Sequence, residues 1–193
     1  MLNCKEDSSH TFGMTNYVFF ERNSSMNNIY LVGMPGCGKS TIGAKVAEKI
    51  GTTLIDADEH IVNREGRTIP EIFKEGEAVF RKAETEALKD LALKDNLFVA
   101  TGGGIVTVSE NIDIMKSSGK VIFIDASVDF ILDKSSLEGR PLLKDKSRIY
   151  DLYKARIDLY RKAADFTIAN DGILSDVCNR LEEVVRKISK NQK

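Results

Sequence analysis

Short apolar runs alternate along this chain with longer stretches in which apolar and polar residues are interleaved. Each run is only a few residues long and is followed by polar residues or glycine, as expected of a buried strand that ends in a loop. Five runs fit this description, so we predict strands at residues 29–32, 54–55, 97–100, 121–124 and 166–169.

Between the predicted strands, apolar residues recur every three or four positions, which places them on one face of a helix. Such stripes are formed by Ile42, Val46 and Ile50, by Phe80, Ala83, Ala87, Leu88 and Leu91, and by Val177, Leu181, Val184, Val185 and Ile188. Thr68 and Glu71 have the spacing of a capping box, in which a hydroxyl and a carboxylate satisfy free amide groups at a helix start. A further helix should therefore begin there.

The alternation of strands and helices predicts the fold class. Parallel strands joined by right-handed helical crossovers form a sheet that helices cover on both faces. We therefore expect an α/β protein with three layers, α/β/α, around a five-stranded parallel sheet. The ligand-binding loops of such a fold lie at the carboxyl ends of its strands, so the functional residues are expected there.

The chain has 193 residues and a mass of 21.5 kDa, which suits one domain with its own hydrophobic core. Residues 1–27 are rich in Asn, Ser and Thr and show neither helical nor strand periodicity. We expect them to form a flexible extension, followed by the domain over residues 28–190. Met26 directly precedes the first strand, so an upstream start site and a functional tail both stay open.

Composition and charge narrow the classes of partner. Hydrophobic residues make up 42% of the chain and charged residues 30%, the balance of an ordinary globular protein. The 28 Lys and Arg residues are matched by 29 Asp and Glu residues, so no general basic excess attracts nucleic acid or an acidic membrane. The early apolar run at residues 17–20 is too short for a membrane span. Cys4, Cys37 and Cys178 form no Cys-x-x-Cys pair, which fits a reducing cytoplasm.

Residues 33–40, with the sequence GMPGCGKS, match the phosphate-binding pattern G-x-x-x-x-G-K-[ST]. They stand between a predicted strand and a predicted helix, the context that disfavours a chance glycine-rich turn. The glycines let the backbone approach a phosphate, and the amide groups at the helix start supply partial positive charge. Lys39 adds a full charge and Ser40 would ligate Mg2+. This phosphate loop predicts an ATP-dependent phosphotransferase.

Cys37 lies inside the phosphate loop and has two interpretations. A thiol near a helix amino end is often reactive, which would suit redox control. A small side chain that fits a tight loop is the simpler explanation.

Four further segments follow the phosphate loop in order: Asp56-Ala57-Asp58, Phe80-Arg81, Thr101-Gly102-Gly103-Gly104 and Arg140-Pro141-Leu142-Leu143. Many families share the phosphate loop, whereas this combination is specific, and it closely resembles shikimate kinases over residues 28 to about 188. The resemblance implies a small monomeric kinase of the nucleoside monophosphate kinase type with a closing lid. It also implies transfer of the ATP γ-phosphoryl group to the 3-hydroxyl of shikimate, in the chorismate route to aromatic amino acids.

The resemblance implies roles for individual residues. The catalytic residues would be Lys39, Asp58 and Arg140. The ATP-binding residues would be Gly36, Cys37, Gly38, Lys39, Ser40, Thr41 and Arg140. The substrate-binding residues would be Asp58, Arg81, Gly102, Gly103, Gly104 and Arg156, with both arginines on the substrate carboxylate. Ser40 would bind Mg2+ directly and Asp56 through water.

The residue types suit that substrate independently. A small anion with vicinal hydroxyls needs guanidinium groups for its carboxylate and a carboxylate to accept its hydroxyl protons. Glycines let the backbone come close to a ring that a side chain would obstruct.

Structural explanations compete with these roles at several positions. The three glycines after the third strand are also common in simple turns. A helix cap explains one of Asp56 and Asp58 but not both. Arg81 lies beside the apolar stripe, and by periodicity alone it would be a surface arginine paired with Glu84 or Thr85.

Arg156 shares a helical stripe with Ile149, Leu152 and Tyr160, which places its guanidinium on the inward face. The alternative is an arginine that lies along that face and reaches solvent. The family usually has Pro-Leu-Tyr two residues after this arginine, where this chain has Asp158-Leu159-Tyr160.

Residues 133–147 are polar, contain Gly and Pro, and separate two helical patterns, so we predict a lid. Its closure would exclude water and bring Arg140 to the ATP phosphates. The family often has an arginine near the lid start, and Lys134 is the nearest equivalent here. Lysine does not stack as a guanidinium does, which puts the adenine contact in doubt.

Two other functions compete with this interpretation. Another small kinase with the same loop, such as a gluconate or nucleotide kinase, would not need Asp-x-Asp together with Gly-Gly-Gly. A nucleotide-binding regulatory module would not need the acceptor residues at all.

Overall fold

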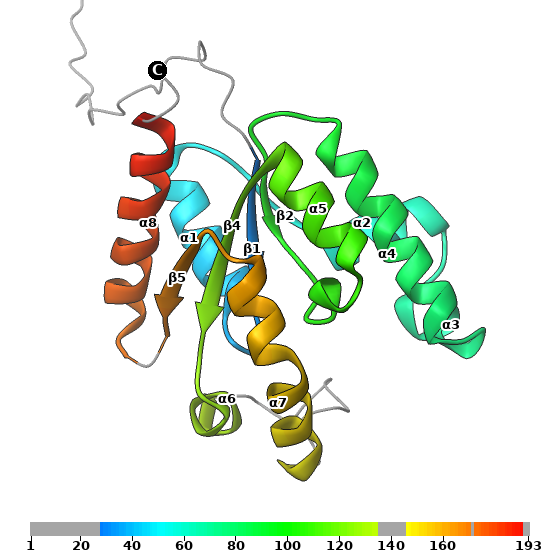
Figure 1. Cartoon of the computed structure of the whole chain (residues 1–193). Coiled ribbons are helices and arrows are strands. Elements are labelled where there is room, and N and C mark those ends of the chain that lie inside the picture. Colours follow the sequence, from blue (N-terminus) through cyan, green and yellow to red (C-terminus); the bar gives the residue numbers. More distant parts are fainter. Residues whose placement is uncertain (1–27, 135–145, 171, 191–193) are drawn as a thin grey trace, which may run out of the picture.

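The computed structural model describes residues 28–134, 146–170 and 172–190, in which helices flank one sheet (Figure 1). All neighbouring strands are parallel, in the order β2-β3-β1-β4-β5. They are β1 (Asn28–Val32), β2 (Leu54–Asp56), β3 (Phe98–Ala100), β4 (Gly119–Asp125) and β5 (Phe166–Ala169). The predicted α/β class and five-stranded parallel sheet are confirmed. Three strands are longer than predicted, since β1 begins at Asn28, β2 includes Asp56 and β4 spans Gly119–Asp125, whereas β3 begins only after Leu97.

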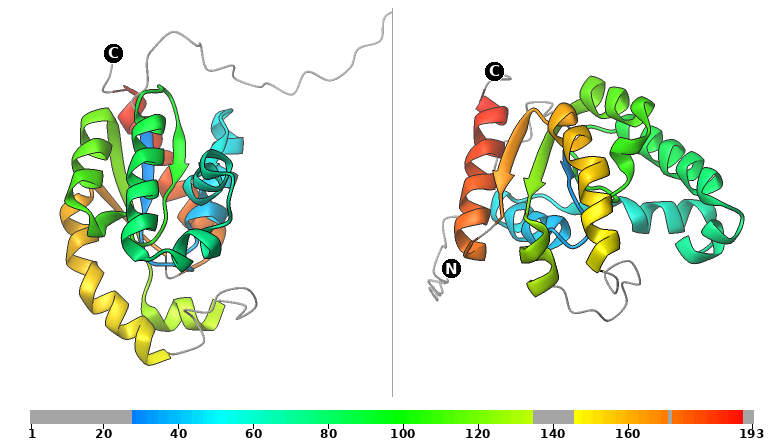
Figure 2. Two further views of the ribbon diagram at one scale, coloured as in Figure 1. Left: turned by 90° about the vertical axis from the view of Figure 1, so that its right-hand side faces the viewer. Right: turned by 60° about the horizontal axis from the view of Figure 1, so that its bottom comes forward.

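One or more helices follow each strand. They are α1 (Lys39–Ile50), α2 (Ala57–Glu65), α3 (Ile69–Lys74), α4 (Glu77–Ala92), α5 (Ser109–Ser118), α6 (Val128–Lys134), α7 (Lys146–Ala163) and α8 (Leu174–Lys190), with a 3-10 helix at Ile105–Thr107. One face of the sheet is covered by α1 and α8, and the other by α5 and α7 (Figures 1 and 2). This arrangement gives the three predicted layers.

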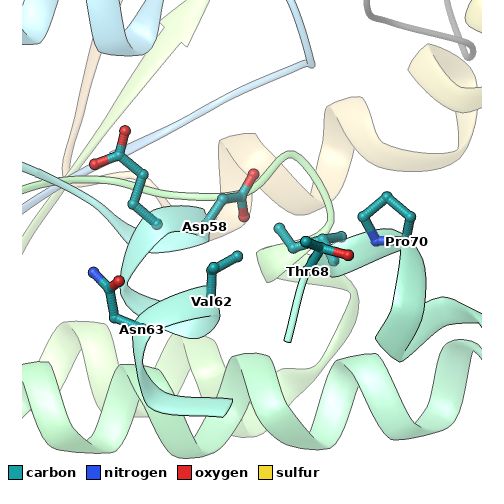
Figure 3. Close-up of a pocket in the computed structure, with 7 residues that line it drawn as sticks. Asp58, Val62, Asn63, Thr68 and Pro70 are labelled. Carbon is teal, nitrogen blue, oxygen red and sulfur yellow. The ribbon is translucent and has the colours of Figure 1, made fainter. Parts of the chain in front are cut away.

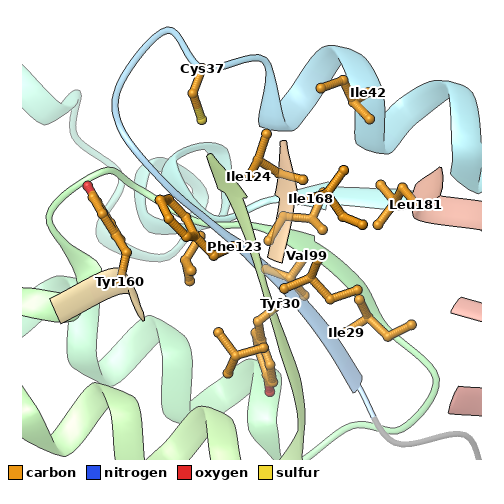
Figure 4. Close-up of a cluster of buried hydrophobic side chains, with 14 of the residues drawn as sticks. Ile29, Tyr30, Cys37, Ile42, Val99, Phe123, Ile124, Tyr160, Ile168 and Leu181 are labelled. Atoms are coloured by element: carbon orange, nitrogen blue, oxygen red, sulfur yellow. The ribbon is translucent and has the colours of Figure 1, made fainter. Parts of the chain in front are cut away.

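The main core forms around β1, which lies at the centre of the sheet and is buried along its whole length. A central parallel strand has helices over both faces, which is why its sequence is a continuous apolar run. Side chains from the strands meet Ile42 of α1 and Leu181 of α8 (Figure 4). On the other face, the rings of Phe123 and Tyr160 stack with their centroids 5.2 Å apart.

A second, smaller core joins α2, α3 and α4 beside the sheet. It contains Ile61, Ile72, Phe80, Ala83 and Ala87. The predicted capping box is present at the start of α3, where the Glu71 carboxylate accepts hydrogen bonds from the Thr68 N–H and hydroxyl. This small core packs α2 and α3 against α4.

The predicted flexible extension, residues 1–27, lies outside the described residues. Of the predicted lid, residues 133–134 end α6 and residues 146–147 begin α7, so helices occupy both of its ends. Residues 135–145 are not described, and the prediction for Arg140 falls there. No helix in the described ranges is both long enough and apolar enough to cross a membrane.

Candidate active site

The phosphate loop joins β1 to α1 at the carboxyl edge of the sheet. Gly33, Gly36 and Gly38 have φ values of 148°, 83° and 94°, a region that L side chains rarely adopt. Gly38 is the N-cap of α1, and no side chain caps the amide groups of the first turn there. Such a helix start is an anion-binding site.

Lys39 is folded back onto the loop that precedes it. Its Nζ donates hydrogen bonds to the carbonyls of Gly33, at 2.8 Å, and Met34, at 3.0 Å. The Cys37 Sγ lies 3.7 Å from the same Nζ. Lys39 is 8% exposed and Cys37 is fully buried, so the thiol packs inside the loop.

Ser40 and Asp56 come together between α1 and β2. The Ser40 hydroxyl donates to Asp56 Oδ2 at 3.0 Å. Asp56 also caps α2, because its Oδ1 accepts the backbone N–H of Asp58 at 2.9 Å. A hydroxyl and a carboxylate beside an anion site are hard oxygen donors of the kind that Mg2+ prefers, so the residues present fit this ion.

Asp58 lies in the first turn of α2 and not at the end of the preceding strand, β2. Its Oδ1 is buried and has no hydrogen-bond partner among the described residues. Burial raises the pKa of this carboxyl, and the nearby charge of Asp56 raises it further. The helix cap therefore accounts for Asp56 and leaves Asp58 as an unsatisfied acceptor.

Glu84 is a site residue that the sequence pattern presented only as a salt-bridge partner of Arg81. It lies on α4 and is 2% exposed, and its Oε1 is also unpartnered within the described part of the chain. Burial raises the pKa of its carboxyl despite the neighbouring Arg81. A β-carbon added to Gly102 would lie 2.9 Å from Glu84 Oε1 and 3.0 Å from Asp58 Oδ1. The two free carboxylate oxygens thus flank Gly102.

Arg81 is paired with Glu84, as the helical spacing indicated, but it is not an exposed surface residue. Its Nη1 donates to Glu84 at 2.8 Å and its Nη2 to Glu77 at 3.0 Å, yet its side chain is only 16% exposed. A β-carbon on Gly104 would clash with both Nη atoms. The guanidinium therefore lies against the glycine turn, and three of its five N–H donors are not used by these two bonds.

Arg156 and Tyr160 of α7 converge on the same glycine turn. Arg156 Nη1 donates to the Gly103 carbonyl at 3.2 Å, and the Tyr160 hydroxyl donates to the same oxygen. Burial raises the pKa of the Tyr160 hydroxyl well above its usual range, so this donor stays protonated. On the other side of the turn, a β-carbon on Gly103 would lie 2.6 Å from Pro35 Cδ. The turn is thereby fixed between α7 and the phosphate loop.

A pocket of about 420 Å³ opens beside these residues, between α2 and the start of α3. Asp58 and Val62 lie on one wall, and Thr68 and Pro70 on the other (Figure 3). Asp58 therefore lines this pocket and also lies beside Gly102.

The structure therefore brings most of the predicted site residues to one edge of the sheet. Thr41 is exposed in the first turn of α1. Arg140 lies outside the described residues, and so does the side chain of Lys134.

The sequence matches the family model of shikimate kinase over residues 35–191. A shikimate kinase of Clostridium botulinum is 42% identical over 160 residues, which cover 82% of this chain and 97% of the relative. One from Acinetobacter baumannii is 38% identical over 167 residues, which cover 83% of this chain and 93% of that protein.

Solved structures give the same result. The shikimate kinase of Acinetobacter baumannii in complex with shikimate superposes with a TM-score of 0.78 at 36% identity, covering 85% of this chain and 95% of that one. The shikimate kinase of Bacteroides thetaiotaomicron superposes with a TM-score of 0.77 at 28% identity, covering 84% of this chain and 99% of that one. A gluconokinase of Sinorhizobium meliloti gives 0.58 at 12% identity over 87% of this chain and 96% of its own, so it shares the fold alone.

Proposed function

The chain belongs to the shikimate kinase family, and from this premise we propose that it transfers the γ-phosphoryl group of ATP to the 3-hydroxyl of shikimate. The products are 3-phosphoshikimate and ADP. One observation carries this proposal: Asp58 and Glu84 each have a buried carboxylate oxygen without a hydrogen-bond partner among the described residues. Arg81 and Arg156 lie beside them, at the same edge of the sheet as the phosphate loop.

On the acceptor side, a buried carboxylate oxygen without a donor costs free energy until a ligand supplies one. Asp58 is proposed to accept hydrogen bonds from shikimate hydroxyls and to orient the 3-hydroxyl for attack. The free N–H groups of Arg81 and the guanidinium of Arg156 would bind the carboxylate. Gly102, Gly103 and Gly104 would let the ring lie against the backbone, with Glu84 fixing Arg81.

On the donor side, Lys39 and the amide groups of the phosphate loop would bind the ATP phosphates, with Gly36, Cys37, Gly38 and Thr41 in contact with the nucleotide. Ser40 would ligate Mg2+ directly and Asp56 through water, and the ion would neutralise charge on the phosphates. Arg140 is proposed to reach the phosphates from the lid. Positioning and electrostatic stabilisation would supply most of the catalysis.

We also propose that the enzyme acts as a monomer in the cytoplasm. Cys37 and Cys178 are free and buried, as suits a reducing compartment. Sedimentation velocity on the purified chain tests the monomer, and a species of twice the mass would contradict it.

The decisive experiment is a coupled assay of ADP formation with purified protein, MgATP and shikimate. We expect turnover that depends on shikimate and disappears when EDTA removes the metal. Gluconate and a nucleoside monophosphate serve as competing acceptors, and turnover with either above that with shikimate would favour another small kinase. ATP binding without turnover on any acceptor would favour a regulatory module.

Replacing Gly104 by alanine is expected to raise the KM for shikimate by at least about tenfold. The new methyl group would occupy the position of the Arg81 guanidinium and displace it from the acceptor site. Gly172→Ala is a matched control, because no atom of the described residues lies within 4 Å of its added β-carbon. A shikimate KM of the Gly104→Ala enzyme within about twofold of the parent would contradict this placement of Arg81.

A further inference from the structure

We propose that Asn170 is a positioning residue for the nucleotide, whose side chain holds the Cys37–Gly38 peptide group so that the Gly38 N–H points at the phosphates. Asn170 directly follows β5 and lies at the carboxyl edge of the sheet, 133 positions from Cys37 in the sequence. Its Nδ2 donates a hydrogen bond of 2.8 Å to the Cys37 carbonyl oxygen.

The orientation of this peptide group decides whether the loop binds an anion. The peptide is planar and trans, so its C=O and N–H point in opposite directions. A carbonyl held outward therefore directs the N–H of Gly38 inward. Gly38 has φ 94° and ψ 9° and no side chain, so it offers little resistance to a flipped peptide. The N–H groups of the phosphate loop point at one place, and their partial positive charges repel each other while no anion is bound. A hydrogen-bond partner outside the loop is therefore needed to keep them in this orientation.

The carbonyls of Gly33 and Met34, by contrast, accept hydrogen bonds from residues of the phosphate loop itself. Lys39 holds the carbonyls of Gly33 and Met34, and the Cys37 N–H donates to the Met34 carbonyl at 3.2 Å. Lys39 must turn toward the phosphates when nucleotide binds. Asn170 is neither a loop residue nor a phosphate ligand. Its hydrogen bond to the Cys37 carbonyl can therefore stay in place when the nucleotide binds and reacts.

Asn170 is itself held firmly. It is 6% exposed, and its backbone N–H donates to the Asp125 carbonyl at the end of β4 at 2.6 Å. The carbonyl of the preceding Ala169 accepts from Arg180 of α8 at 2.8 Å. A β-carbon on Gly38 would lie 3.0 Å from Asn170 Nδ2, so the amide also packs against the N-cap of α1. Two strands and a helix thus fix the donor before nucleotide binds.

The inference rests on the proposed nucleotide site but not on the acceptor, so it is tested by binding of MgADP to the full chain in a calorimeter, without shikimate. Asn170→Leu keeps the number and branching of the side-chain heavy atoms but has no donor, and we expect its Kd for MgADP to rise about tenfold. Asn170→Asp differs by one atom, cannot donate when ionised and adds negative charge, so its Kd should rise further. Asn170→Ser keeps a donor and should recover part of the loss. In the coupled assay, the shikimate KM of each variant should stay within about twofold of the parent.

Asn28→Leu is the matched control. Asn28 is 1% exposed and donates to the Lys94 carbonyl at 2.7 Å, but it lies at the first residue of β1, at the opposite edge of the sheet. It should lower the thermal midpoint and leave the Kd for MgADP unchanged. Asn170 variants that lose thermal stability with an unchanged Kd would show a purely structural role and overturn the proposal. The proposal would also be overturned if the Kd for MgADP and the KM for shikimate rose by the same factor. If the parent chain binds no MgADP, the proposed nucleotide site itself fails.

Discussion

Replacing Lys39 by methionine is expected to lower kcat by about 10³-fold, or roughly 4 kcal/mol of transition-state stabilisation. Methionine keeps most of the side-chain length and packing and removes only the charge. The Lys39 ammonium lies 2.8 Å from the Gly33 carbonyl oxygen, within the phosphate loop. The transferred phosphoryl group spreads negative charge over its oxygens, and this ammonium is the nearest full positive charge in the described part of the loop.

Steady-state kinetics with saturating shikimate and varied MgATP measure this effect. Lys45→Met is the matched control, since Lys45 lies on the same helix and is exposed. The control should keep kcat within about twofold of the parent. The thermal midpoint of Lys39→Met should change little, because the relief of a buried charge offsets the loss of its two hydrogen bonds to the loop carbonyls. A kcat within about tenfold of the parent would contradict the role of Lys39.

Replacing Asp58 by asparagine is expected to lower kcat/KM for shikimate by about 10²-fold or more, with little change in the KM for ATP. The amide has the shape of the carboxylate but is a weaker acceptor, and it presents two N–H groups where the hydroxyl protons should go. Since Asp58 Oδ1 has no partner within the described residues, this acceptor is free for the substrate. Kinetics with each substrate varied in turn separate the two KM values.

The same substitution should make the protein more stable at neutral pH. Burial and Asp56 raise the pKa of Asp58 in the folded protein above its unfolded value, so folding disfavours the ionised carboxyl. That penalty is fully present above the folded pKa and is lost as the pH falls to the unfolded pKa. Asparagine carries no such penalty, so we expect its thermal midpoint to be about 2 to 4 °C higher at pH 7. The difference should shrink in acid.

Thermal scans of both proteins at several pH values test this linkage. Other carboxyls titrate in both chains, so the difference between the two midpoints isolates Asp58. Asp95→Asn, at an exposed aspartate in the loop before β3, should change neither activity nor stability. A lower midpoint for Asp58→Asn at pH 7, or a gain that does not depend on pH, would contradict the unfavourable burial of this carboxylate.

The five strands, their parallel sheet and the phosphate loop were predictable because each depends on residues close together in the chain. A strand in a covered sheet needs a continuous apolar run, and a phosphate loop needs its glycines, lysine and serine within eight positions. The capping box at Thr68 and Glu71 is equally local. The sequence also predicted that a helix cap would explain only one of Asp56 and Asp58, and Asp56 is that cap.

Only the tertiary structure decided the remaining features, because burial depends on what packs against a residue and not on its neighbours in sequence. Arg81 and Glu84 resemble an exposed helix pair until the glycine turn after β3 covers them. Tyr160 is bonded to a carbonyl 57 positions away, and Asn170 to one 133 positions away. The sequence alone thus determined the fold class and the phosphate loop, while the order of the strands placed the acceptor carboxylates beside that loop.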